Sequence, residues 1–356
     1  MSFTPFNGPL LSGLIGDMQI AQQFSIKADL AAMLRFEIAL AKTQTEFDVI
    51  PKAAEKAIAD LGKSFEPDME ALRTGVIQDG MAVPDFVRQL KAAISEPHAQ
   101  YVHFGSTSQD VIDTSAILRL VEVNAIFEAR LNKLEIHLQS LAEKFGAQGL
   151  MAQTRMQQAL PIKVRDRLAS WSRTIHKYQS QFADIQTSLN IVQFAGPVGT
   201  LDKFGDIGPD IRKALAKELG LGDPGYAWHT DRSTLCEYVH WMNAVGSALG
   251  KVGQDIVLMA QNERDEIRLA NTGGSSAMAH KKNPVRAEIL ITLAHFISVQ
   301  CAGFQGNLIH EQERSGAAWT LEWMLLPQIC VATGAALNNA ITLVQSIESI
   351  GSETAI

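Results

Sequence analysis

Three polar stretches of this 356-residue chain combine hydroxyl, amide and cationic side chains at spacings that suit an anionic ligand. The first polar stretch is residues 103–110 (HFGSTSQD), the second is residues 153–158 (QTRMQQ), and the third is residues 273–284 (GGSSAMAHKKNP). Hydroxyl groups, backbone N–H groups at the start of a helix and a lysine are the donors that a carboxylate requires. Together the three stretches indicate a site for a small carboxylate.

Each stretch also has an ordinary structural interpretation. Hydroxyl residues before a helix are typical N-caps, which satisfy the free N–H groups of the first turn. The Gly-Gly-Ser-Ser run at 273–276 is typical of a flexible linker, and Asn283-Pro284 is typical of the start of a helix. A common ligand site is the favoured interpretation because a helical bundle does not need three polar turns of this composition.

The elements that must position these stretches are long helices. There is no proline between Pro97 and Pro161, between Pro161 and Pro197, or between Pro224 and Pro284. Within these windows apolar residues recur at steps of three and four. In the last window the recurring residues are Leu235, Tyr238, Met242, Val245, Leu249, Val252, Ile256 and Met259. This spacing predicts helices that pack at shallow angles, each about 40–55 Å long.

The remaining segments complete the predicted fold. Two further helices are expected from about residue 284 to 308 and from about 317 to 347, with a kink at Pro327 in the second. No window alternates apolar and polar residues for long, so no sheet core is expected. The sequence predicts an all-α fold, with a small N-terminal helical domain over residues 1–95 and an elongated bundle of long helices over residues 96–356.

Composition narrows the class of protein. Charged residues make up 19% of the chain, below the roughly 25% of an average soluble domain, which favours an oligomer that covers part of each subunit. The net charge of −7 argues against a nucleic-acid partner. The cysteines Cys236, Cys301 and Cys330 show no paired spacing, so a reducing, cytoplasmic location without disulfides is expected.

Residues 323–346 carry no charge and are long enough to cross a membrane as a helix. The segment also holds Pro327, Gln328, Asn338 and Asn339, and no basic cluster flanks it. A helix buried on all sides within the bundle is therefore favoured over a membrane span.

The third polar stretch carries a resemblance to a known family. Residues 274–278 (GSSAM), followed by Lys281 and Asn283-Pro284, resemble the signature of the fumarase/aspartase superfamily, whose usual form is Gly-Ser-Ser-x-Met-Pro-x-Lys-x-Asn-Pro. Ala279 stands where proline is usual. The first and second polar stretches match the superfamily's other two active-site regions in order and approximate spacing. In the second, Arg155 and Gln158 stand where histidine is usual.

The resemblance implies an enzyme that adds a nucleophile and a proton across a C=C bond conjugated to a carboxylate, or reverses this addition. It assigns proton transfer to Ser276, supported by Lys281, and an active-site role to His103. The substrate-binding residues that it implies are Ser106, Thr107, Ser108, Gln157, Gln158, Arg232, Lys281, Asn283 and Arg314. A histidine packed at a helix start, and arginines that are solvated helix charges, are the alternatives for His103, Arg232 and Arg314.

The resemblance also implies the partners of the chain. The expected ligand is a small polycarboxylate, and the expected assembly is a homotetramer in which each active site is drawn from three chains. The C-terminal domain of the superfamily is expected to be absent or vestigial. No metal or cofactor is expected, because the sequence holds no His-Glu-x-x-His, Gly-x-Gly-x-x-Gly or Walker-type motif.

Two further stretches favour one branch of the superfamily. Residues 228–232 (WHTDR) and 311–319 (EQERSGAAW) are most similar to the cycloisomerase branch, which closes an unsaturated tricarboxylate to a lactone. A fumarate-releasing lyase, similar to adenylosuccinate or argininosuccinate lyase, is the alternative within the superfamily. A non-catalytic helical scaffold is the alternative outside enzymes, although it would not need to keep Ser276, Lys281 and Asn283 together.

Overall fold

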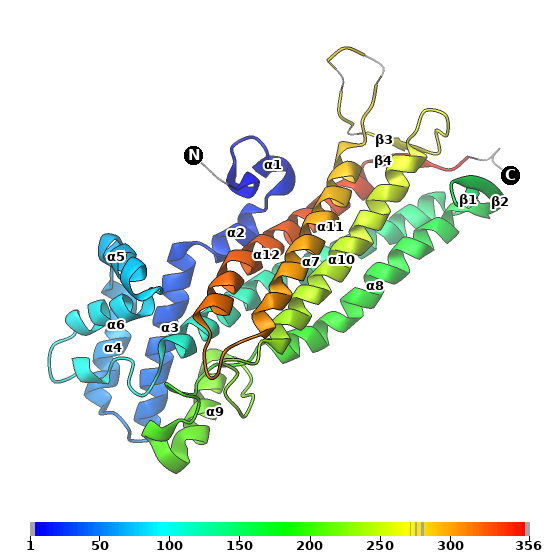
Figure 1. Cartoon of the computed structure of the whole chain (residues 1–356). Coiled ribbons are helices and arrows are strands. Elements are labelled where there is room, and N and C mark those ends of the chain that lie inside the picture. Colours follow the sequence, from blue (N-terminus) through cyan, green and yellow to red (C-terminus); the bar gives the residue numbers. More distant parts are fainter. Residues whose placement is uncertain (1–3, 271, 275, 279–280, 353–356) are drawn as a thin grey trace.

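The computed structural model describes residues 4–270, 272–274, 276–278 and 281–352 and is an elongated, mostly helical molecule (Figure 1). Its long helices run side by side as a bundle. They are α7 (Ser108–Phe145), α8 (Val164–Leu189), α10 (Ser233–Met259), α11 (Val285–Phe304) and α12 (Gly316–Gln345). α7, α8 and α10 lie in the windows whose apolar spacing predicts helices, and α11 and α12 match the two further helices expected, so the long-helix bundle is confirmed. α12 continues through Pro327 as one helix.

Close packing of α10 against α11 depends on small residues. A Cβ atom added at Gly253 would lie 2.5 Å from the backbone oxygen of Ala287, and one at Gly250 would lie 2.6 Å from Cβ of Ala294. Real Cβ atoms do not approach so closely. These glycines therefore allow the two helix backbones to come together, which buries the apolar stripe predicted for α10.

The other helical elements surround the bundle. They are η1 (Pro5–Asn7), α1 (Ser12–Ile15), α2 (Met18–Gln23), α3 (Ile26–Glu46), α4 (Lys52–Ser64), α5 (Met69–Asp79), α6 (Val83–Ala92), η2 (Ala99–Tyr101), η3 (Asp202–Ile207), α9 (Gly208–Leu219) and η4 (Gln305–Leu308). Figure 1 shows α3 to α6 and α9 gathered at one end of the bundle, beside the start of α7.

Two groups of buried apolar residues form the cores. One follows the long helices and includes Phe6 and Ile20 from the N-terminal segment. The other joins α3 to α6 and the start of α7 with residues 192–219, and it includes Phe36 and Leu215. The two cores thus interleave along the chain, while the division at residue 95 stays a prediction about how the chain divides into domains.

Strands occur as short antiparallel ribbons at the other end of the bundle (Figure 1). β1 (Gly149–Thr154) pairs with β2 (Gln157–Lys163), and β3 (Ile267–Leu269) pairs with β4 (Ile347–Ile350). Ser352, just after β4, bridges Gly149 at the start of β1. The ribbons do not form a sheet core, in agreement with the sequence, but the β1–β2 hairpin that carries the second polar stretch was not predicted.

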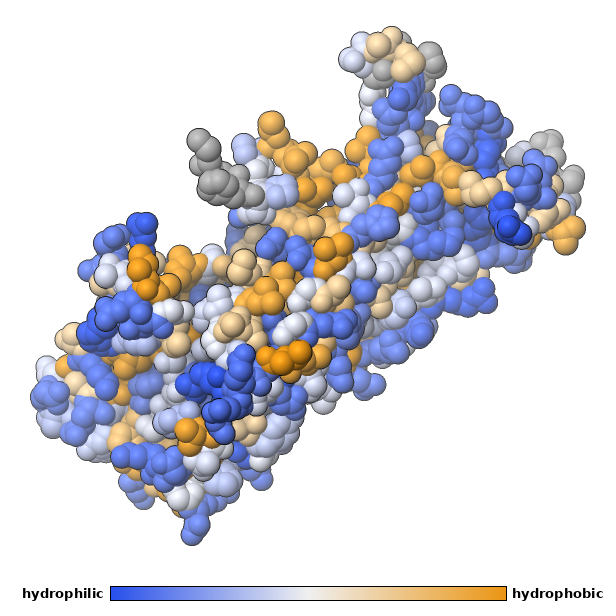
Figure 2. All heavy atoms as spheres, viewed as in Figure 1, coloured by the Kyte–Doolittle hydropathy of each residue, from blue (hydrophilic) through white to orange (hydrophobic). Residues whose placement is uncertain are grey.

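Within the described residues, two helical segments are long and apolar enough to cross a membrane: Val285–Leu308 and Gly316–Gln345. The most apolar window of α12 is 72% buried inside the molecule, as expected for the core helix of a bundle. The corresponding window of Val285–Leu308 is only 33% buried. On its outward side Val299 is 72% exposed, and Figure 2 shows hydrophobic residues at several places along this side of the molecule.

Candidate functional site

The first polar stretch lies where α7 begins and is organised by a buried carboxylate. Asp110 is fully buried. It accepts hydrogen bonds from the backbone N–H groups of Thr107, Ala195 and Gly196, each at 3.0 Å, and lies 3.1 Å from Nε2 of His229. These contacts tie the loop at 193–197 to the first turn of α7. Asp110 is therefore a positioning group and is not available to a ligand.

Arg314 adds a cation at this position. Its Nε donates to Oε1 of Gln109 at 2.9 Å, and its Nη2 donates to Oγ1 of Thr107 at 3.3 Å and to the carbonyl of Pro197 at 3.1 Å. The half-buried hydroxyls of Ser106, Thr107 and Ser108 lie at the N-terminal end of the helix, which carries a partial positive charge. The structure thus brings Arg314 together with the first polar stretch, in an arrangement that suits a carboxylate.

His103 is fixed by a second buried carboxylate, Glu37 of α3. The ring Nδ1 lies 2.6 Å from Oε1 of Glu37, and the backbone N–H of His103 donates to Oε2 at 3.0 Å. The His103 side chain is 16% exposed and that of Glu37 is 1% exposed. Burial on its own would lower the pKa of His103. The charge of Glu37 and its hydrogen bond outweigh burial and raise the pKa above 6.5.

Arg232 does not lie at this surface. Its side chain is 1% exposed and is held between Asp113, at 2.7 Å, and Glu322, at 2.5 Å. The ring N–H of Trp319 donates to the same Asp113 at 3.0 Å, and the guanidinium stacks on Trp228 at 4.8 Å. In the single chain the donors of Arg232 are occupied by buried carboxylates, so this geometry does not bring its guanidinium to a substrate. The group is a structural ion pair.

The second polar stretch forms the β1–β2 hairpin, and Arg155 and Met156 make its tip with positive φ angles of 48° and 67°. Gln157 and Gln158 are exposed on the hairpin. The hairpin begins beyond the C-terminal end of α7, and the first polar stretch precedes its N-terminal end. Since α7 has 38 residues, the two stretches are separated by about 57 Å of helix. One chain cannot bring them together.

The described residues of the third polar stretch lie in a loop that projects from the end of the bundle near β3 (Figure 1). At its base Gly273 and Asn283 exchange two backbone hydrogen bonds of 2.8 Å, and Nδ2 of Asn283 donates to the carbonyl of Gly274 at 3.3 Å. Ser276 and Lys281 are exposed on the loop. Because β3 pairs with β4, which leads to the base of the hairpin, the second and third stretches share one end of the molecule.

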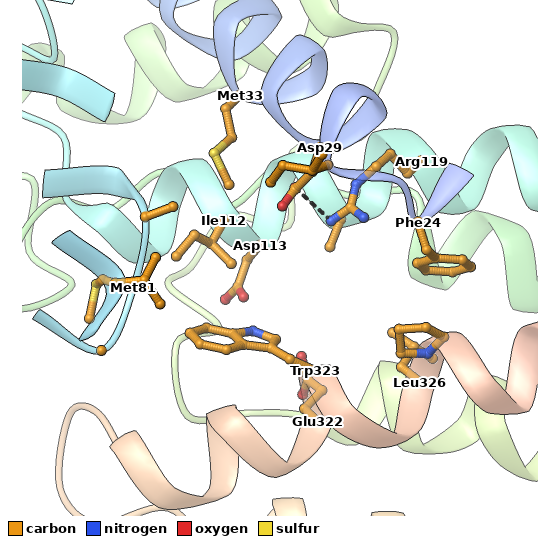
Figure 3. A pocket seen from close by; sticks show the side chains of 16 residues that line it. Phe24, Asp29, Met33, Met81, Ile112, Asp113, Arg119, Glu322, Trp323 and Leu326 are labelled. Atoms are coloured by element: carbon orange, nitrogen blue, oxygen red, sulfur yellow. Dashed lines mark ion pairs between the residues drawn. The ribbon is translucent and has the colours of Figure 1, made fainter. Parts of the chain in front are cut away.

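A cavity of about 340 Å³ opens between α3, the turn from α5 to α6, α7 and α12. Figure 3 shows its labelled side chains pointing into a common space, with an ion pair of 2.9 Å between Asp29 and Arg119. The lining residues are Phe24, Ile26, Asp29, Met33, Val76, Gly80, Met81, Ala82, Ile112, Asp113, Ala116, Arg119, Glu322, Trp323, Leu326 and Pro327.

The charges of this cavity do not favour an anion. Asp29, Asp113 and Glu322 are carboxylates, and Arg119 is already paired with Asp29. Burial raises the pKa of Asp29, which Arg119 only partly offsets. Ile112 lies one helical turn beyond Ser108 on the same side of α7, so the cavity adjoins the first polar stretch. Its apolar walls suit an uncharged group, while the donors for a carboxylate lie at the start of the helix.

Comparison with known proteins decides the family. The sequence profile of a family described as lyase matches residues 16–298. The chain belongs to this lyase family. It is therefore an enzyme of the fumarase/aspartase superfamily, as the resemblance of the third polar stretch implies.

Individual members of the lyase family align with nearly the whole chain. The 3-carboxy-cis,cis-muconate cycloisomerase of Acinetobacter baylyi is 32% identical over 348 residues, which cover 95% of this chain and 77% of that protein. The solved structure of the 3-carboxy-cis,cis-muconate lactonizing enzyme from Pseudomonas putida superimposes with a TM-score of 0.90 at 30% identity, covering 96% of this chain and 77% of that one.

A fumarate lyase from Mesorhizobium sp. BNC1 superimposes with a TM-score of 0.89 at 27% identity, covering 96% of this chain and 78% of that one. The fold of the lyase family is therefore shared by relatives with different named activities. The expectation that the C-terminal domain is absent or vestigial stays a prediction.

Sequence reasoning missed two carboxylates of this lyase site, Glu37 and Asp110. Asp110 follows Thr107 by three residues, a spacing typical of a helix N-terminus whose side chains satisfy free N–H groups reciprocally. That signal marks Asp110 as part of the helix start. Glu37 has no comparable signal, because its partner His103 lies 66 residues away in the chain.

Proposed function

We propose that this enzyme closes 3-carboxy-cis,cis-muconate to a carboxymuconolactone in protocatechuate catabolism, the β-ketoadipate pathway. One observation carries the proposal: a cycloisomerase of that name is 32% identical over 95% of this chain. A 3-sulfo analogue is a further candidate substrate, because a sulfonate offers charge and acceptor oxygens similar to those of a carboxylate. We place the enzyme in the cytoplasm, since its cysteines are free and buried.

The proposed reaction is an isomerisation in which no second product leaves. A carboxylate oxygen of the substrate forms a C–O bond to one end of the conjugated C=C. The π electron pair moves toward the carboxylate at the other end, which gives an enolate-like dianion. The carbon beside that carboxylate then takes a proton from the hydroxyl of Ser276. Positioned donors lower the barrier because the charge that they stabilise develops during the step.

Each polar stretch has a proposed task in this reaction. Lys281 and Asn283 hold the carboxylate beside the reacting carbon, and Lys281 also stabilises the alkoxide of Ser276. At the start of α7 the hydroxyls of the first polar stretch and Arg314 hold a second carboxylate. Gln157 and Gln158, exposed on the hairpin, donate to a carboxylate or lactone oxygen. No task is given to Arg232, because its guanidinium is buried and paired.

The proposed assembly is a homotetramer with shared active sites. Support comes from the placement of the stretches at opposite ends of a 38-residue helix, because Ser276 and the first polar stretch meet only if they come from different chains. Further support comes from the Val285–Leu308 segment, whose most apolar window is two-thirds unburied in the single chain. A helix that is apolar on all sides is expected to be buried.

The second polar stretch favours cyclisation over elimination. An amine or hydroxide leaving group needs a proton. A lyase that expels such a group therefore needs a general acid to supply that proton. A lactone carboxylate leaves as a stable anion, since carboxyl groups have pKa values of about 4. Arg155 and Gln158 occupy the positions where the superfamily usually has histidine, and a cycloisomerase tolerates this loss more easily. A fumarate-releasing lyase is the second candidate, supported by the similarity to a fumarate lyase structure.

Ultraviolet absorbance of purified enzyme with 3-carboxy-cis,cis-muconate tests the proposal, because ring closure removes a conjugated double bond. We expect loss of the muconate absorbance with one product of unchanged mass. In parallel, adenylosuccinate and argininosuccinate are assayed for fumarate release. Fumarate release without any turnover of the muconate would show that the enzyme belongs to the elimination branch.

A further inference from the structure

The contact between Glu37 and His103 has a specific geometry. The two carboxylate oxygens of Glu37 accept from two different groups of the same residue, the ring Nδ1 at 2.6 Å and the backbone N–H at 3.0 Å. Glu37 lies in the middle of α3 and is buried, so it cannot swing away from His103. A carboxylate in this place fixes the proton on Nδ1 and leaves Nε2 for a partner other than Glu37.

The backbone around His103 is held in place as well. His103 has a φ angle of 61°, in the left-handed region that costs energy for most residues. Nε2 of Gln44, two helical turns after Glu37 on α3, donates to the carbonyl of Phe104 at 2.7 Å. Both anchors come from α3, so this helix sets the position of the whole first polar stretch relative to α7.

We propose that Glu37 is a positioning residue that keeps His103 protonated and directs its Nε2–H toward a substrate carboxylate. The inference rests on the proposed function, because it places His103 at the substrate. Glu37 itself touches no substrate. It acts by fixing the ring orientation and by making the imidazolium favourable at a pH where a free histidine has lost its proton.

The charges that face His103 determine the sign of the pH dependence. Glu37 on α3 and Asp110 on α7 favour the protonated ring, and Lys91 at the end of α6 opposes it. The balance raises the pKa of His103 above 6.5, even though burial lowers it. The cationic form binds an anionic substrate, so kcat/KM falls as the pH rises through the pKa of His103. Replacement of Glu37 by a neutral residue shifts that fall to lower pH.

The main test compares pH profiles of kcat/KM for wild type and Glu37→Gln, which keeps the size of the side chain and removes its charge. We expect a loss of a few-fold at pH 6 and of about tenfold or more at pH 8, carried mainly by KM. The matched control is Glu135→Gln. Glu135 contacts His176 at 3.1 Å in an exposed pair on the outside of the bundle, so this variant should keep the wild-type profile. A uniform loss at every pH would overturn the proposal.

A second variant keeps the test decisive if Glu37→Gln folds poorly. Asparagine tolerates the left-handed backbone at position 103, and its side-chain amide can donate to Glu37, but it does not titrate. His103→Asn should lose the alkaline fall of kcat/KM altogether, and adding Glu37→Gln to it should not change the shape of the profile further. An alkaline fall that persists in His103→Asn would show that another group titrates.

Thermal unfolding without substrate separates this inference from the proposed function. A group whose folded-state pKa is raised contributes stability below its unfolded pKa of about 6.5, and loses it as the pH rises through the folded value. The Tm difference between wild type and Glu37→Gln should therefore shrink from pH 6 to pH 9. A Tm difference that stays constant from pH 6 to pH 9 would show that the ion pair between Glu37 and His103 does not stabilise the protein. Failure of wild type to turn over muconate would instead refute only the proposed reaction, and the profiles would then be measured on the substrate that releases fumarate.

Discussion

Arg314 and Gln109 are 205 residues apart in the chain, yet Nε of Arg314 donates to Oε1 of Gln109 at 2.9 Å. The contact joins the loop before α12 to the first turn of α7. It also completes a set of donors around Thr107, because Nη2 of Arg314 reaches its hydroxyl at 3.3 Å. The start of α7 is thus a preorganised patch of hydroxyls, amides and one guanidinium.

Replacement of Arg314 by lysine should weaken substrate binding. The guanidinium of Arg314 serves Gln109, Thr107 and the carbonyl of Pro197 at once, and a lysine cannot reproduce this fork. A lost hydrogen bond to a charged group costs about 1.5–3 kcal/mol, so KM should rise by about 10-fold or more while kcat changes less. Steady-state kinetics measure this. Arg173→Lys, at an exposed position of α8, is the control and should leave KM unchanged.

Ser276→Ala should lower kcat by about 10²–10⁴, the usual range for a positioned acid or base. Ser276 is exposed on the third polar stretch, away from any apolar core, so the variant should fold with an unchanged Tm. The comparison is Ser275→Ala, at a neighbouring position that lies outside the described residues, and it should cost less. Equal and mild losses of kcat in both variants would indicate that the loop is only a flexible linker.

Arg232→Gln should destabilise the protein. It leaves the buried carboxylates of Asp113 and Glu322 without their cation, a change that costs about 3–5 kcal/mol. Burial already raises the pKa of Glu322, and loss of Arg232 raises it further. Protonation then relieves the repulsion, so the loss of Tm should be largest near pH 8 and smaller near pH 5. A Tm equal to that of wild type at neutral pH would contradict the ion-pair assignment.

Two impaired variants should partly restore activity to each other. His103 and Ser276 lie at opposite ends of α7, so a site shared between chains can draw one intact residue from each variant subunit. Co-expression of His103→Asn with Ser276→Ala should give about a quarter of sites with both residues intact when subunits mix randomly. Mixing of the purified homo-oligomers without subunit exchange is the control. No recovery in the mixed oligomer, or sedimentation as a monomer at micromolar concentration, would argue against shared sites.

Gly253→Ala should push α10 and α11 apart. The new Cβ would meet the backbone oxygen of Ala287 at 2.5 Å, and overpacking of this kind costs about 1–3 kcal/mol. Gly316→Ala places a methyl group where no heavy atom lies within 4 Å and serves as the control. Urea unfolding followed by circular dichroism measures both. Equal stability of the two variants would mean that α11 shifts without cost.

The long helices could be predicted because their apolar residues recur with a period that is visible in the sequence alone. The β1–β2 hairpin could not be predicted. Tight hairpin turns are usually recognised by a glycine or an asparagine in the sequence, whereas here Arg155 and Met156 adopt the positive φ angles. The extent of the second core could not be predicted from the sequence either. α9 joins it through contacts such as the hydrogen bond of 2.9 Å from Arg35 to the carbonyl of Leu219, 184 residues apart.

Residue types in the site were easier to predict than their surroundings. The first polar stretch and Arg314 do lie together, because Arg314 donates to Gln109 and to Thr107. Arg232 has the same side-chain type as Arg314, but its two carboxylate partners lie 119 and 90 residues away, and only the fold shows that they bury it. A pattern of residue types does not distinguish a buried cation from one that faces a ligand.

The uninterrupted α7 limits how this chain can change over evolutionary time. Inserting or deleting one residue in an α-helix turns everything beyond it by about 100° and shifts it by about 1.5 Å. Such a change would misalign the hairpin at one end with the hydroxyl patch at the other. Exposed side chains along the helix, such as Glu135, can be substituted without this effect. The number of residues from Thr107 to Gly149 cannot change without it.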